Sequence, residues 1–100
     1  MFGGNMMEKL QKMQGQMEEI KKRLDTITVQ GGAADGKVVV FMNGNRKVTD
    51  VQIAPELLAK DVEELQDLIL VATNRALDSA NSVNESEMQS AAMGMMPGLG

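Results

Sequence analysis

The stretch that decides the fold is MMEKLQKMQGQMEEIKKRL, residues 6–24. Its apolar side chains recur at alternating intervals of four and three residues, the a/d pattern of a heptad repeat. They are Met6, Leu10, Met13, Met17, Ile20 and Leu24. An isolated helix of this length is only marginally stable in water, so this seam has to be buried against a second surface. We therefore expect a long helix that packs on another part of the chain or on a second chain.

Beyond the first helix, the apolar period changes from that of a helix to that of a strand at Asp25. Residues 26–30 alternate polar and apolar side chains, and residues 37–42 (KVVVFM) are β-branched or apolar on both faces. Asn43-Gly44-Asn45 is a hairpin-turn signal, after which residues 47–53 return as a third strand. These segments predict a three-stranded antiparallel β-meander.

The third strand carries apolar side chains on both parities. Val51 and Ile53 share one face, whereas Val48 falls on the opposite face if the strand is regular. This pattern predicts a sheet that is buried on one side and partly covered on the other.

Residues 31–37 (GGAADGK) come close to the phosphate-binding loop of nucleotide-binding proteins. That motif requires Ser or Thr after the lysine and a helix that begins there. Here Val38 follows Lys37, and the lysine begins a predicted strand. We therefore interpret residues 31–36 as a loop between two strands and expect no nucleotide site.

A second long helix is predicted after the sheet. Pro55 favours a short helical turn through Leu58, and Asp61 with Glu64 forms a capping box for the helix that follows. The main apolar stripe of this helix is Leu65, Leu68, Ile69, Ala72, Ala76 and Ala80. It is widened by Leu70, Val71 and Leu77. Because one sheet face does not need so wide a stripe, the excess indicates a subunit contact.

The whole pattern predicts an α+β domain over residues 1–93, built from a long helix, the meander and a second long helix. Residues 1–5 read as a lead-in with Asn5 as the helix N-cap, and residues 94–100 as a flexible Met/Gly/Pro tail. The 100 residues include only two aromatic side chains but ten methionines, so the core is thin. We expect an intertwined or side-by-side homodimer. The candidate interface residues are Met13, Met17, Ile20, Phe41, Leu70 and Val71.

Composition argues against most catalytic chemistry. The sequence has no His, Cys or Tyr, so the usual general bases and nucleophiles are missing, and we expect neither an enzyme nor a cofactor. Glu63, Glu64 and Asp67 form an acidic patch that we interpret as a solvated helix face rather than a metal site. The longest apolar run, residues 68–72, is too short to span a membrane, and no secretory signal is expected.

The charges leave two interpretations open. A net charge of −4 argues by itself against non-specific nucleic-acid binding. However, charges beyond roughly 8 Å are screened at physiological salt, so local clusters matter more than the total. The basic side chains on the first helix and the hairpin are either solubility charges or part of a binding patch.

Several motifs, in order, are similar to those of one family. The most specific are GKVVVFMNG at residues 36–44 and IAPELL at 53–58, and the second half adds DVEELQDL at 61–68 and ATNRA at 72–76. With the Met/Gln-rich first helix and the Met/Gly/Pro-rich end, the chain resembles the YbaB/EbfC family of bacterial nucleoid-associated DNA-binding proteins. Membership implies a homodimer with a three-stranded sheet per subunit and helices that project as arms around DNA. It also implies a location in the cytoplasm at the nucleoid, with roles in nucleoid organisation and gene regulation.

The resemblance implies double-stranded DNA as the partner but fixes no base-reading residues. The expected phosphate contacts are Lys9, Lys12, Lys21, Arg23, Arg46 and Lys47. The family commonly has more basic arms, whereas this first helix mixes Glu8, Glu18 and Glu19 with its lysines. Lacking aromatic stacking residues, the chain is expected to recognise phosphates and shape with little sequence preference.

Two alternatives compete with DNA binding. The Met-rich helical arms suit an adaptor that captures other proteins, because methionine side chains adapt to many surfaces. A helix that lies on a membrane surface, from Lys9 to Arg23, is less favoured because its charges are mixed and it lacks Trp and Phe.

Overall fold

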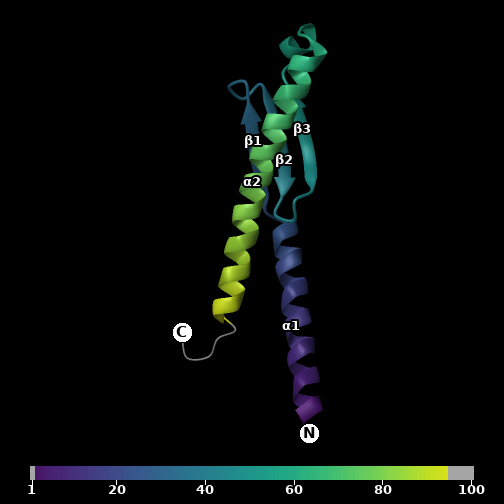
Figure 1. The fold of residues 1–100 in the computed structure, drawn as a ribbon, viewed down its shortest axis with the longest axis vertical. Coiled ribbons are helices and arrows are strands. Elements are labelled where there is room, and N and C mark those ends of the chain that lie inside the picture. The colour runs from purple at the N-terminus through teal and green to yellow at the C-terminus, as the bar shows by residue number, and fades with distance from the viewer. Residues whose placement is uncertain (1, 95–100) are drawn as a thin grey trace.

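The computed structural model describes residues 2–94 of the chain, and side chains from Asn5 to Met93. The molecule is elongated: its principal extents are 69 × 24 × 18 Å, and its radius of gyration is 19.3 Å. A compact domain of this length has a radius of gyration of about 13 Å. The excess arises because α1 extends away from the sheet, while α2 crosses the sheet and continues beside α1 (Figure 1).

The predicted α+β architecture is confirmed. The sheet is antiparallel in the order β1-β2-β3. A 3₁₀ helix, η1, joins the sheet to α2, as Pro55 predicted. The elements are α1 (Phe2–Asp25), β1 (Thr28–Ala33), β2 (Val38–Asn43), β3 (Val48–Ile53), η1 (Pro55–Ala59) and α2 (Val62–Gly94).

Both helices are longer than the sequence indicated. α1 begins at Phe2, so the predicted lead-in with an N-cap at Asn5 is wrong: the helix includes Gly3 and Gly4, whose intrinsic cost is only about 1 kcal/mol each. α2 continues to Gly94. The rest of the predicted tail, residues 95–100, lies outside the described part of the chain.

The predicted loop at residues 31–36 is partly wrong, because β1 continues through Gly31 and Gly32 to Ala33. Gly31 pairs with Val40 of β2 and lies directly under α2. A Cβ at this position would overlap the backbone nitrogen of Ala76 and the carbonyl oxygen of Ala72. Glycine therefore marks a close approach of helix and strand rather than a break in the strand.

The predicted orientation of Val48 is also wrong. Val40 pairs with Val51, but after an irregularity between Phe41 and Met42 the next pair is Met42 with Val48. One extra residue on β3 restores Val48 to the same face as Val51, as a β-bulge does. That face is the one on which α2 lies, because Val40 and Met42 belong to the core beneath α2.

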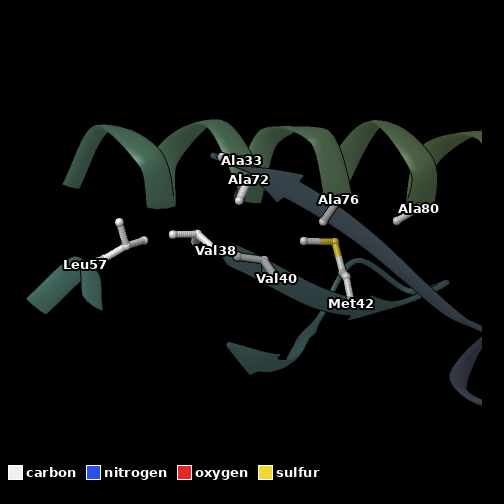
Figure 2. Close-up of a cluster of buried hydrophobic side chains, with 8 residues drawn as sticks. All are labelled: Ala33, Val38, Val40, Met42, Leu57, Ala72, Ala76 and Ala80. Atoms are coloured by element: carbon white, nitrogen blue, oxygen red, sulfur yellow. The ribbon is translucent and has the colours of Figure 1, made fainter. Parts of the chain in front are cut away.

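The core is a thin layer between α2 and the first two strands (Figure 2). The alanines of α2 point toward Val38, Val40 and Met42 of β2, and Leu57 of η1 closes one end. Small side chains on α2 let the helix backbone approach the sheet closely. The fully covered alanines are Ala72, Ala76 and Ala80.

The seam of α1 is buried only where the helix meets the sheet. Ile20 and Leu24 are 3% and 1% exposed, whereas Met6, Leu10, Met13 and Met17 are between 45% and 64% exposed. The distal seam therefore has no covering surface within the described chain. Within residues 2–94, neither helix has a stretch long and apolar enough to cross a membrane.

Candidate nucleic-acid interface

The predicted phosphate-binding residues on α1 occupy two flanks of the helix. At 100° per residue, Lys9, Lys12 and Arg23 share one flank, and Lys21 lies on the opposite flank. Lys9 and Lys12 are exposed and lie toward the N-terminal end of α1, away from the sheet. They are therefore free to meet a partner that approaches the arm.

Arg23 is paired within the chain. Its Nε lies 2.9 Å from Oε2 of Glu87, an ion pair that joins α1 to α2. Both side chains are partly exposed, so water screens the pair, and such bridges contribute about 0.2–1 kcal/mol. Arg23 is thus held by a carboxylate in the free chain and offers less positive charge to an anion than Lys9 or Lys12.

A second basic group surrounds a hollow of about 440 Å³ where α1, the β2–β3 turn and α2 meet. Its basic residues are Lys21 of α1 and Arg46 and Lys47 of the turn. Asp25 also lines the hollow, but its Oδ1 accepts hydrogen bonds from amides of Asn45, at 2.6 Å, and Asn43, at 3.4 Å. The hollow therefore combines three cations with one carboxylate that is already hydrogen-bonded.

The six predicted residues thus lie in three places rather than along one continuous groove. Lys9 and Lys12 lie on the distal arm, Arg23 is in the ion pair, and the other three surround the hollow. α2 adds no cation near either group, since the sequence has no Lys or Arg after Arg75. The basic side chains around the arms and the hollow therefore belong to α1 and the turn.

The predicted interface residues also separate. Ile20 is buried inside the chain, against the α1–α2 junction, and so presents no surface to a second copy. Met13 and Met17 are exposed on α1, and Leu70 and Val71 are 59% and 39% exposed on α2. Phe41 is half-buried on the face of β2 opposite α2.

Sequence reasoning missed the polar residues that organise the hollow. Asn43, Asn45 and Asn84 bond to backbone or carboxylate groups of other elements. Asn43-Gly44-Asn45 gave a signal for a turn, but nothing local indicated which helices the turn would contact. Within the described residues, no cluster of three or more acidic side chains could hold a metal ion.

Comparison with known proteins agrees with this architecture. The model of the YbaB/EbfC DNA-binding family matches residues 2–96. A nucleoid-associated protein of Flavobacterium johnsoniae is 39% identical over 94 residues, which cover 94% of this chain and 88% of that protein. One from Legionella pneumophila (strain Corby) is 36% identical over 92 residues, 92% of this chain and 82% of that protein.

A solved structure supports the fold alone. An uncharacterised protein from Helicobacter pylori superposes with a TM-score of 0.71 at 24% identity, covering 87% of this chain and 89% of that one. The family match spans both arms, the sheet and the hollow between them. With that match and relatives above 30% identity over nearly their whole length, the chain belongs to the YbaB/EbfC DNA-binding family.

Proposed function

We propose that this chain is a nucleoid-associated protein that binds duplex DNA as a homodimer and alters its conformation. Family membership supports DNA as the ligand, and the names of the relatives support a place at the nucleoid. Roles in nucleoid organisation and gene regulation follow from such binding. The observation that carries the proposal is the exposure of Lys9 and Lys12 on a long arm that nothing in the described chain covers.

Phosphate contacts explain how an acidic chain can bind DNA. Residues 5–25 of α1 have five basic and four acidic side chains, whereas α2 beyond Arg75 has acidic ones only. α1 is therefore the more basic of the two arms although the whole chain is negative. A dimer has two copies of each basic cluster, so phosphate contacts made by both subunits would contribute to its DNA affinity.

A titration against salt tests this mode of binding. We expect the logarithm of the association constant for a labelled duplex to fall linearly with the logarithm of salt concentration, by about 0.9 per phosphate contact. Fluorescence anisotropy at several salt concentrations measures the slope. Binding that is absent at low salt, or that does not respond to salt, would contradict the proposal.

Removal of Glu87 should strengthen DNA binding. In Glu87→Gln, Arg23 loses its carboxylate partner and becomes available to phosphate, while folding stability falls by at most about 1 kcal/mol. The salt slope should gain about one unit for each released arginine. Glu85→Gln is the matched control, because it removes the same charge from an exposed site on the same helix. If the two changes strengthened DNA binding equally, the release of Arg23 would not explain the gain in affinity.

The second copy in this proposal covers apolar surface that one chain leaves exposed. β3 is an edge strand, and Val48 and Val51 are 51% and 44% exposed on it, beside α2 rather than beneath it. An exposed edge strand with apolar side chains is a surface on which another chain can pair. The distal seam with Met13 and Met17, together with Phe41, Leu70 and Val71, supplies further apolar surface.

Disruption of β3 should separate the subunits. We expect Val51→Lys to raise the dimer dissociation constant at least tenfold, since a buried lysine in a subunit contact is costly. Val62→Lys makes the same change at another exposed valine, at the start of α2, and should leave the dimer intact. Sedimentation equilibrium measures both. A wild-type chain that sediments as a compact monomer at micromolar concentration would contradict the dimer itself.

An adaptor that binds proteins is the second candidate, and the exposed methionines of α1 favour it. Met6, Met7, Met13 and Met17 are all at least 45% exposed. A DNA titration of the purified chain distinguishes the two functions. If the chain binds DNA and the salt slope falls when Lys9 and Lys12 are replaced, DNA binding is supported. DNA binding that is undetectable even at low salt, together with a stoichiometric protein partner recovered from a nuclease-treated lysate, would favour the adaptor.

A further inference from the structure

The β2–β3 turn contacts the end of α1 through its backbone. The nitrogen of Gly44 donates hydrogen bonds to the carbonyl oxygens of Leu24, at 2.9 Å, and Ile27, at 3.1 Å. Leu24 is 1% exposed, and a Cβ at Gly44 would lie 2.8 Å from its Cδ2 and 2.9 Å from its carbonyl oxygen. The turn and the last turn of α1 are therefore in direct contact, with no room for a side chain between them.

Two asparagine side chains reinforce this contact. Nδ2 of Asn45 donates to the carbonyl oxygen of Lys21, at 2.9 Å, and to Oδ1 of Asp25, at 2.6 Å. Asn43 is 8% exposed; its Oδ1 accepts hydrogen bonds from the backbone nitrogens of Asn45, at 2.9 Å, and Lys47, at 3.1 Å. Asn43 thus holds the shape of the turn, and Asn45 holds α1 to it.

The same turn contacts α2. Nδ2 of Asn84 donates to the carbonyl oxygen of Gly44, at 3.3 Å, and Nε of Arg46 donates to Oδ1 of Asn81. Arg46 adopts a φ of 67°, in the left-handed region that is uncommon for a non-glycine residue. Such backbone strain persists only where surrounding contacts hold it.

Apart from the packing of Ile20 against α2 near the sheet, few contacts set the direction of the arm. Toward the N-terminus the seam of α1 is exposed from Met17 outward, and the Arg23–Glu87 pair is partly solvated. A long helix that is held only at one end pivots about that end. We infer that the turn at residues 43–47 is a positioning element that fixes the direction of α1 relative to the sheet and α2.

The consequence for DNA rests on the proposed function. If both arms of a dimer contact one duplex, the second contact is intramolecular, and its strength depends on how well the arm spacing fits. A turn that holds each arm in one direction keeps the effective concentration of the second arm at the DNA high. A loosened turn lowers affinity without removing any phosphate-binding residue.

Distance measurements between spin labels test the inference directly. Because the chain has no cysteine, Gln11→Cys on α1 and Gln89→Cys on α2 provide two unique labelling sites, both exposed. Dilution with unlabelled chain restricts the signal to distances within one subunit. We expect Asn45→Ala to broaden and shift the distance distribution, while the circular dichroism spectrum is unchanged. Asn74→Ala, the same change at an exposed site on α2, should reproduce the wild-type distribution.

A second variant keeps the test decisive if Asn45→Ala does not fold. Asn84→Ala removes only the bond from α2 to Gly44 and should broaden the distribution less. A wild-type distribution in the folded asparagine variants would overturn the inference. If Asn45→Ala changes the distances but the wild-type chain does not bind DNA, the positioning role is supported and the proposed function is contradicted. A several-fold loss of DNA affinity in Asn45→Ala, with the salt slope reduced by less than one, supports both.

Discussion

Gly31→Ala should destabilise the folded domain by about 3 kcal/mol or more, at the upper end of what overpacking costs. The added Cβ would overlap backbone atoms of Ala72 and Ala76 and lie 2.8 Å from the carbonyl carbon of Arg75. Backbone cannot move aside as a flexible side chain can, so α2 has to separate from β1. That separation opens the thin core along the alanine stripe. Urea denaturation followed by circular dichroism measures the change in free energy of unfolding.

The adjacent residue provides a matched control. Gly32 lies in the same strand, but a Cβ there would meet its nearest neighbour, the carbonyl oxygen of Val38, at 3.7 Å, an ordinary contact distance. Gly32→Ala should therefore change stability by less than about 1 kcal/mol, and can increase it by restricting the unfolded chain. Equal stability of the two variants would show that α2 does not pack against Gly31 as described.

The sequence predicted the order and type of the elements because those signals are local. The heptad seam, the alternation in the strands and Asn43-Gly44-Asn45 all act within a few residues. Gly31 was interpreted as loop because glycine is a poor strand former, and its reason for being there is a helix more than 40 residues away. The β3 bulge, which turned Val48 to the face of Val51, likewise arises from pairing rather than from composition.

The site was harder to predict than the fold. Helical spacing puts Lys9, Lys12 and Arg23 on one flank of α1, but it could not show that Glu87, 64 residues later, pairs with Arg23. Nor could it show that Lys21 joins the turn residues at the hollow. Such groupings depend on how α1 and α2 lie beside each other, which three-dimensional packing alone decides.

Reversal of the two free arm lysines should have the largest effect on DNA binding. In Lys9→Glu with Lys12→Glu, each subunit loses the two cations that we propose contact phosphate and gains two repelling charges. For a dimer, the salt slope should fall by about 4, one unit for each lost contact, and binding at physiological salt should become undetectable. Both positions are exposed, so the domain should fold as before. Anisotropy titrations with a labelled duplex at several salt concentrations measure the slope.

The matched control makes the same change in net charge as the arm variant, but at the other end of the molecule. Lys37 directly precedes β2, at the end of the sheet opposite the β2–β3 turn, and Lys60 follows η1. Each lies beside a carboxylate, at 3.4 Å from Glu56 and 3.5 Å from Glu64. Lys37→Glu with Lys60→Glu should retain most of the affinity and nearly all of the salt slope, because long-range repulsion is screened beyond roughly 8 Å. If this control abolished binding as fully as the arm variant, net charge rather than contact by α1 would govern DNA affinity. If only the arm variant loses DNA binding, the phosphate contacts lie on α1.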